Sequence, residues 1–143
     1  MENNEHPTWL VPIDIAKELK EIGFNEPCNH YVRISNDDIK LKINHSSIGL
    51  VILKRNSEYL NDDIASFVTI PTWTEVFAWF RARGLYSYIR SYIAPENFYI
   101  YSIYDNNNFD KCCGRRDTYE EAQKECVKAL IQIYKKELEK NNL

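Results

Sequence analysis

The chain has 143 residues, of which 44% are hydrophobic and 13% aromatic, and its formal net charge is −3. This composition excludes a largely disordered chain and suffices for one folded domain of ordinary size. The sequence has no basic excess that would attract nucleic acid non-specifically and no apolar run long enough to span a membrane.

The N-terminal residues 1–11 are expected to form a flexible arm before a single α+β domain at residues 12–140. The first residues are acidic and polar, unlike a signal peptide, so we expect a cytoplasmic protein. Apolar residues recur at helical spacing over residues 13–22, and Gly23 follows them as a residue that ends helices. This pattern predicts the first helix.

After Pro27 the hydrophobic period changes to that of strands. Three segments separated by short polar turns are expected to be strands: residues 30–34, 39–43 and 48–53. The second of them alternates between apolar and charged residues, as a half-buried strand does. A polar connection at 56–63 and a short extended stretch at 67–70 lead to the next helix.

That helix is the most clearly defined element in the sequence. Thr72 and Glu75 have the spacing of a capping box at its start, and Gly84 suits its end. Trp79 and Phe80 lie near its middle, and we expect at least one of them to be almost fully buried.

A hairpin is expected to follow, with strands at residues 85–93 and 98–104 joined by a four-residue turn at 94–97. The residues from 105 to 116 are polar and are predicted to form a loop.

The last helix is predicted to begin at Thr118, which has capping-box spacing to Glu121. Its expected buried stripe consists of Ala122, Cys126, Leu130 and Ile133. The chain therefore reads as α+β, with three helices on an antiparallel sheet of about five strands in the order α-β-β-β-α-β-β-α.

The hairpin contains an unusual group of aromatic residues. If Ile93 pairs with Phe98 across the turn, alternation places most of the tyrosines around one arginine on one face of the sheet. The predicted binding residues on this face are Tyr86, Tyr88, Arg90, Tyr92, Tyr99 and Tyr101. The sequence leaves open which face of the sheet is buried.

Tyrosine combines flat apolar area with a polar tip, which suits protein interfaces. We therefore expect a non-catalytic protein-interaction module, with an unidentified protein or a second copy of the chain as partner. Binding of single-stranded nucleic acid on the same face is the alternative, since bases stack on aromatic rings. Tyrosine is also common on the outer faces of sheets for its β-propensity alone.

The chain lacks a Gly-rich phosphate loop, a nucleophile elbow and a zinc-binding helix motif. We expect no catalytic residues, no metal and no cofactor. Four cysteines lack the spacing of a disulfide framework: Cys28, Cys112, Cys113 and Cys126. A metal or redox role for Cys112 and Cys113 stays open, and an enzyme would need Cys28, His30 or Cys112 brought together.

Three segments occur in an order that resembles a known group: residues 19–24, ending Gly-Phe; residues 71–81, a Pro-Thr-capped helix bearing Trp-Phe-Arg; and residues 118–122, reading Thr-Tyr-Glu-Glu-Ala. Together they resemble small uncharacterised proteins encoded in phages and prophages of gut bacteria. The resemblance implies a phage-derived, cytoplasmic accessory protein without catalytic activity, and it supplies no functional residues. The cysteines and the loop at 105–117 depart from that pattern.

Overall fold

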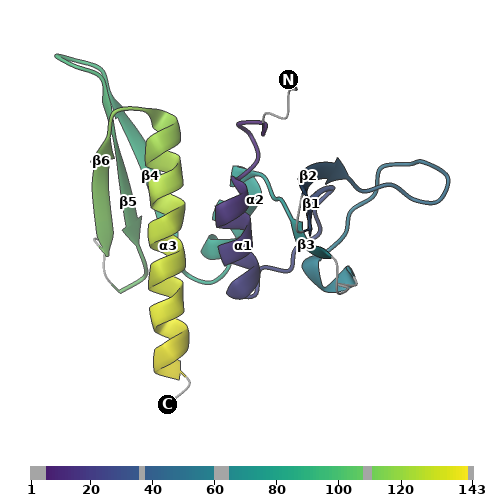
Figure 1. Ribbon diagram of the computed structural model, residues 1–143. Coiled ribbons are helices and arrows are strands. Elements are labelled where there is room, and N and C mark those ends of the chain that lie inside the picture. Colours follow the sequence, from purple (N-terminus) through teal and green to yellow (C-terminus); the bar gives the residue numbers. More distant parts are fainter. Residues whose placement is uncertain (1–5, 36–37, 60–64, 108–110, 142–143) are drawn as a thin grey trace. The chain divides into compact units, whose positions relative to one another are not determined.

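The computed structural model describes residues 6–35, 38–59, 65–107 and 111–141. The chain divides into two compact units, Met1–Trp73 and Thr74–Leu143, which are described separately (Figure 1). The α+β class is confirmed. In the described part of the chain, six strands form two antiparallel sheets of three strands each, rather than about five strands in one sheet.

The first unit contains a helix, α1 (Ile13–Glu21), and then β1 (His30–Ser35), β2 (Asp38–Ile43), a short 3-10 turn, η1 (Asn56–Glu58), and β3 (Ala65–Thr69). The sheet has the order β2-β1-β3, so β1, the first of the three predicted strands of this unit, is the central strand. Elements α1, β1 and β2 confirm the sequence predictions to within one residue at each end.

The predicted third strand at residues 48–53 is wrong. This segment belongs to a tight excursion in which Ser46 N–H donates to Leu50 O at 2.7 Å and only His45 and Val51 form a bridge. Gly49 takes a φ of +87°, a left-handed conformation that bends the chain back before a ladder can form. The third strand of the sheet is β3 instead, where the sequence indicated only a short extended stretch.

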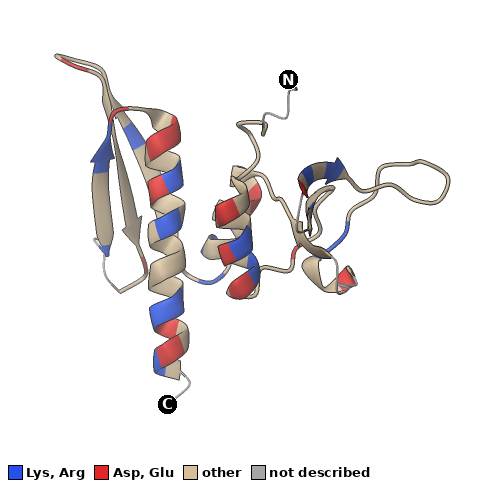
Figure 2. Ribbon diagram, in the orientation of Figure 1, with Lys and Arg blue, Asp and Glu red and all other residues tan. Residues whose placement is uncertain are grey.

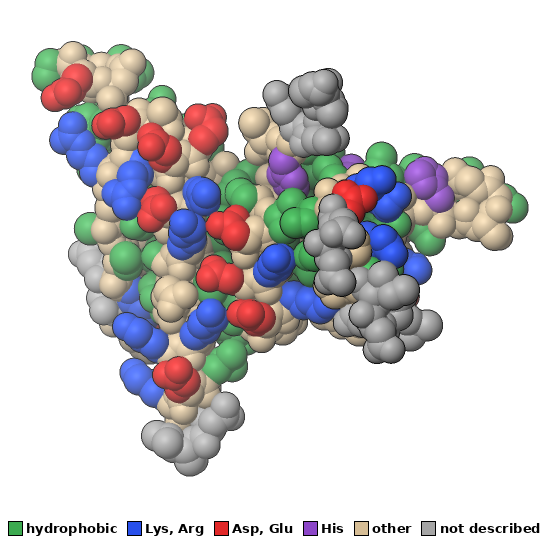
Figure 3. All heavy atoms as spheres, viewed as in Figure 1, with side chains coloured by type: hydrophobic (Ala, Val, Ile, Leu, Met, Phe, Trp, Pro, Cys, Tyr) green, Lys and Arg blue, Asp and Glu red, His purple; other side chains and the backbone are tan. Residues whose placement is uncertain are grey.

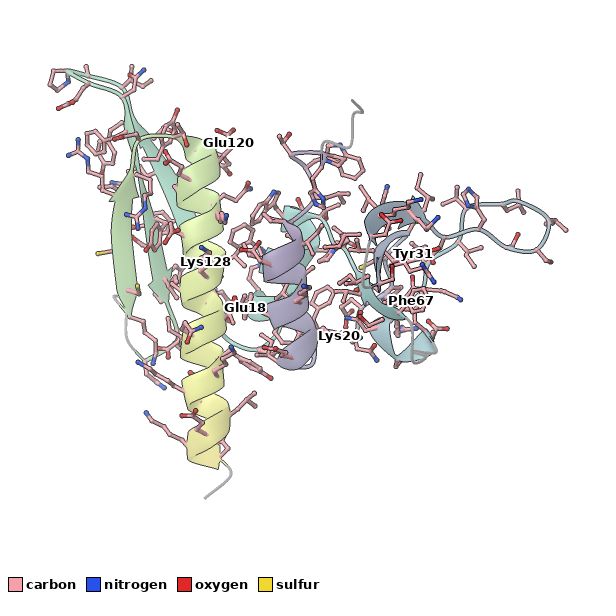
Figure 4. All side chains as sticks on the ribbon, in the orientation of Figure 1. Glu18, Lys20, Tyr31, Phe67, Glu120 and Lys128 are labelled. Atoms are coloured by element: carbon pink, nitrogen blue, oxygen red, sulfur yellow. The ribbon has the colours of Figure 1, made fainter. Side chains whose placement is uncertain are left out.

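Helix α1 ends as its sequence indicates. Gly23 has a φ of +99°, and the Phe24 N–H donates to Leu19 O at 2.9 Å, which closes the last turn over a buried phenylalanine. Lys20 on the same helix extends to β3, where its Nζ donates to Phe67 O at 2.7 Å (Figure 4). This bond links α1 to the outer strand of the sheet.

The end of the expected N-terminal arm includes buried residues. Leu10 and Val11 are almost inaccessible, Leu10 forms a bridge with Thr72, and Val11 N–H donates to Pro71 O at 3.0 Å. Residues 1–5 of the arm lie outside the described residues.

Two buried asparagines hold the irregular segments of the first unit. Asn56 donates from Nδ2 to Phe24 O at 2.8 Å and accepts from the Thr69 N–H at 2.9 Å. Asn44 donates to Cys28 O at 3.1 Å, and its Oδ1 accepts from the Tyr59 hydroxyl at 2.7 Å. Each side-chain amide therefore supplies hydrogen-bond partners to buried backbone groups that lie outside the regular strand ladders.

The second unit consists of α2 (Trp73–Arg81, with its first residue in the first unit), β4 (Tyr86–Tyr92), β5 (Phe98–Tyr104), β6 (Cys112–Arg116) and α3 (Tyr119–Asn141). The strands form a meander in the order β4-β5-β6, and α3 packs along all three. Strand β6 lies inside the segment predicted to be a loop, so that prediction is wrong from Cys112 onward.

The prediction that at least one of the two α2 aromatic residues is almost fully buried is confirmed, and both are buried. Trp79 is 4% exposed and Phe80 is fully buried, and both rings pack edge to face with Tyr134 of α3. At the helix end, Gly84 has a φ of +83° and Leu85 N–H donates to Phe80 O at 3.0 Å. The capping role of Thr72 stays a prediction.

Helix α3 begins at the predicted cap. The Thr118 hydroxyl accepts from the Glu121 N–H at 3.1 Å and lies 2.9 Å from the Glu121 carboxylate. Its buried stripe is Ala122, Cys126, Val127, Leu130 and Ile131, whereas Ile133 is half-buried. Figures 2 and 3 show charges of both signs interspersed along the exposed side of this helix. Among the described helices, none has the length and apolarity to cross a membrane.

Candidate interaction surface

The register of the β4–β5 hairpin differs from the predicted one. Tyr92 pairs with Phe98, and the connection covers residues 93–97, one residue longer than the predicted turn. Because side chains alternate along a strand, a shift of one residue exchanges the two faces of β5 relative to β4. Tyr99 and Tyr101 therefore do not share a face with the predicted binding residues of β4, and this part of the prediction is wrong.

Both displaced tyrosines lie on the face that α3 covers. Tyr99 contacts Tyr119 at the start of α3 with ring centroids 6.0 Å apart. Tyr101 is only 6% exposed, and burial raises the pKa of its hydroxyl. Its ring lies over Gly114 of β6, where a Cβ would come within 2.6 Å of the ring. Tyr101 is thus a core residue of the second unit.

The opposite face of this sheet carries the remaining aromatic residues, and we call it the aromatic face. It is defined by Tyr86, Tyr88, Arg90 and Tyr92 of β4, Phe98, Ile100, Ser102 and Tyr104 of β5, and Cys113 and Arg115 of β6. Four of the six predicted residues are brought together here. Sequence reasoning missed Phe98, Tyr104 and Arg115, which only the correct register could have identified.

The aromatic rings at the hairpin end of this face pack against one another and against an arginine. Tyr92 and Phe98 stack in parallel, with centroids 4.8 Å apart and planes 7° apart. The Arg115 guanidinium lies 3.8 Å from the Phe98 centroid, and it also approaches Glu96 at 3.9 Å. A flat cation over an aromatic face is a favourable arrangement even near water.

The rings at the other end form a second group. Tyr86 and Tyr104 stack with centroids 5.5 Å apart, and Tyr88 is tilted against Tyr104 at 6.2 Å. Tyr88 is 47% exposed, the most accessible aromatic of this face. Cross-strand aromatic pairs of this kind stabilise a sheet and hold their hydroxyl groups in fixed positions.

Arg90 lies between the two groups. Its Nη1 donates to the Tyr92 hydroxyl at 3.2 Å, and its guanidinium lies about 6 Å from the rings of Tyr88 and Tyr92. The hydrogen bond to Tyr92 raises the pKa of Arg90. None of the residues in β4, β5 and β6 is acidic, so the strands themselves give this face a positive charge.

A pocket of about 240 Å³ lies at the edge of the same sheet, beside β4. It is lined by Thr74, Phe77, Arg81, Ser87, Tyr88, Ile89 and Tyr119. Tyr88 thus borders both the aromatic face and this hollow.

The cysteines and histidines considered as metal ligands do not form a metal site within the described residues. Within residues 6–35, 38–59, 65–107 and 111–141, no group of three or more His, Cys, Asp and Glu residues could hold a metal ion. Cys28 is buried, and Cys112 and Cys113 alternate along β6 with only Cys113 exposed. Burial raises the pKa of Cys126 to about 12, which keeps this thiol protonated.

No protein-family model matches the chain, and no curated protein or solved structure shows significant similarity to it.

Proposed function

We propose that the chain is a non-catalytic interaction module that binds a protein partner through the aromatic face of its second unit. The observation that carries the proposal is the side of the β4-β5-β6 sheet opposite α3, where five aromatic rings surround two arginines. Tyrosine and arginine are the residue types enriched where protein interfaces draw most of their affinity. The phage association implied by the sequence resemblance stays a prediction.

The contacts among the rings favour a protein over a nucleic acid. Phe98 is stacked on Tyr92 and lies under Arg115, and Tyr86 is stacked on Tyr104, so these rings already contact each other face to face. Phe98 has Tyr92 of β4 on one side and Arg115 of β6 on the other, so a base could stack on this ring only by displacing one of them. A protein surface needs only ring edges, hydroxyl groups and the guanidinium N–H groups, which this arrangement presents in fixed positions.

Single-stranded nucleic acid remains the second candidate on one specific observation. Arg90 and Arg115 lie on a face whose strands contain no acidic residue. Tyr88 is half exposed on the same face and also lines the pocket. Base stacking on one aromatic ring contributes about 1–3 kcal/mol. A labelled oligonucleotide should be titrated at low and moderate salt, because electrostatic binding is strongest at low salt.

The test of protein binding compares a double variant of the aromatic face with a single variant at a tyrosine outside that face. Tyr88→Ser combined with Arg90→Ser removes two exposed side chains of the aromatic face. Tyr119→Ser removes a tyrosine of similar exposure on the first turn of α3 and serves as the control. Both should unfold at the same denaturant concentration as wild type to within the small effect expected of surface changes.

Affinity capture from the cells that carry the gene, and sedimentation velocity over a range of concentrations, then provide the readout. We expect a captured partner, or a dimer, with wild type and with Tyr119→Ser but not with the Tyr88→Ser/Arg90→Ser variant. A monomer whose captured proteins are the same for both variants would refute the protein-binding proposal. Oligonucleotide binding at low salt that the double variant loses would replace it with the second candidate.

A further inference from the structure

Strand β2 forms one edge of the sheet in the first unit. Among the described strands it pairs with β1 alone. Hydrogen bonds of an antiparallel strand point alternately to its two sides. Because Asn44 N–H donates to Asn29 O, the even-numbered residues of β2 bond toward β1, and the backbone groups of Ile39 and Leu41 face the open edge.

The two faces of β2 differ in chemistry. Ile39, Leu41 and Ile43 share one face, on which Ile39 is 52% and Ile43 44% exposed. The other face carries Lys40 and Lys42, with Arg33 of β1 opposite Lys40. The Asp38 carboxylate lies 3.3 Å from the Lys40 ammonium group. An edge strand with exposed aliphatic residues on one face and cations on the other can pair with a strand that has aliphatic residues on one face and carboxylates on the other.

A hollow lies beside the end of β2 and the start of β1. It has a volume of about 610 Å³ and is lined by Pro7, His30, Tyr31, Leu41, Lys42, Ile43 and His45. The turn that follows β2 adds further exposed aliphatic side chains: Ile48, Leu50, Val51 and Leu53. Exposed apolar groups that are contiguous with an unpaired edge indicate an interaction site more than isolated ones do.

We propose that β2 binds an extended acidic peptide segment of a partner protein by strand addition. In this segment aliphatic residues alternate with Asp or Glu. The aliphatic residues pack beside Ile39, Leu41 and Ile43, the carboxylates pair with Lys40 and Lys42, and the backbone extends the sheet. The partner is separate from the one proposed for the aromatic face.

The charges of β2 argue against a second copy as occupant. Antiparallel pairing of two β2 strands about Leu41 would put Lys40 directly opposite Lys42 of the other chain, twice. Like charges directly opposite each other destabilise a strand pair, and lysines on edge strands are a common protection against self-pairing. An acidic partner turns the same lysines into favourable contacts.

The test titrates the isotope-labelled full chain with a blocked synthetic peptide of alternating valine and glutamate, followed by backbone NMR. We expect saturable shifts in β2 and slower exchange of the Ile39 and Leu41 amides. Lys40→Glu with Lys42→Glu should weaken binding about tenfold, because cross-strand charge pairs become repulsive. Lys17→Glu with Lys140→Glu, two exposed helix lysines, should leave the affinity unchanged.

Two further peptides keep the result interpretable if a variant folds poorly. The valine–lysine peptide should not bind, and the valine–glutamate peptide N-methylated at alternate residues should lose binding, because it keeps the side chains but cannot extend a ladder. Unchanged binding of the N-methylated peptide, or shifts outside β2, would overturn the proposal. Shifts in β2 that appear on raising the protein concentration alone would assign the edge to a second copy and overturn it as well.

Discussion

Tyr101 lies across Gly114 of the neighbouring strand, so close that a Cβ on the glycine would fall 2.6 Å from the phenol ring. The two residues are cross-strand partners on the face that α3 covers. Because the ring is buried between the sheet and the helix, it cannot turn away without disturbing the packing around it.

We expect Gly114→Ala to destabilise the protein by about 1–3 kcal/mol, the usual cost of an extra group in a packed site. Chemical denaturation measures the change in the free energy of unfolding. The cost should fall strongly when Gly114→Ala is introduced into a Tyr101→Ala background, because the ring that it meets is then absent. Equal costs in both backgrounds would show that the contact is not the cause.

Tyr101→Ala by itself should be about as damaging as Trp79→Ala, at about 3–5 kcal/mol for loss of a buried aromatic side chain. Both side chains are almost fully buried, whereas the sequence grouped Tyr101 with the predicted binding residues. Trp9→Ala, which removes a half-exposed tryptophan, is the control and should cost much less. A small effect of Tyr101→Ala in denaturation would contradict the observed register.

The error over Tyr101 has a simple physical origin. The sequence predicted both strands of the hairpin correctly to within a residue, but the length of the connection determines which side chains share a face. Ile93 belongs to the connection instead of pairing with Phe98. The side chains of β5 therefore lie on the opposite faces from those predicted relative to β4. Residues on β4 alone kept their predicted grouping, because alternation within a strand does not depend on the turn.

The helices were more predictable, since their signals are local. Gly23, Gly84 and Thr118 each act at the helix end where the sequence placed them. Strand β6 had no such signal, because Cys-Cys-Gly-Arg-Arg carries little strand propensity and is held by pairing with β5. The opposite error occurred at residues 48–53, where an apolar run predicted a strand. These apolar side chains lie in an exposed turn and form no strand ladder.

Asn56→Ala should destabilise the first unit by about 1–3 kcal/mol, because it leaves buried backbone groups without their partner. The groups affected are the Phe24 carbonyl and the Thr69 N–H. Asn97→Ala, at an exposed position of the hairpin connection, is the control and should have little effect. The two variants are compared by thermal and chemical unfolding, and similar stabilities would show that the Asn56 bonds contribute nothing net.

Cysteine labelling should separate the four thiols by exposure. Cys113 is exposed and should react with a thiol reagent at mildly alkaline pH in the folded protein, with Cys112 slower. Cys28 and Cys126 are buried and should react only when the protein opens. Mass spectrometry of the labelled peptides gives the order, and early modification of Cys126 would contradict its position on the buried side of α3.

The stability of the protein should decrease as the pH rises from about 9 to about 12. Burial raises the pKa of Cys126 from its ordinary value of 9.0 to about 12, and burial likewise raises the pKa of Tyr59 from 10.0 to about 12. Above pH 9 the unfolded chain loses these protons while the folded chain keeps them. Since the unfolded state then binds fewer protons, the free energy of unfolding falls with pH until both states are deprotonated.

Replacing Cys126 by alanine isolates its part of this dependence. The variant should be less stable than wild type near neutral pH, because a buried side chain is lost, yet its stability should fall less steeply between pH 9 and 12. Cys113→Ala removes an exposed thiol and should leave the slope unchanged. Urea denaturation at several pH values measures both slopes. If Cys126→Ala and wild type lose stability in parallel, the buried thiol does not titrate differently in the folded state, and the alkaline dependence belongs to other groups.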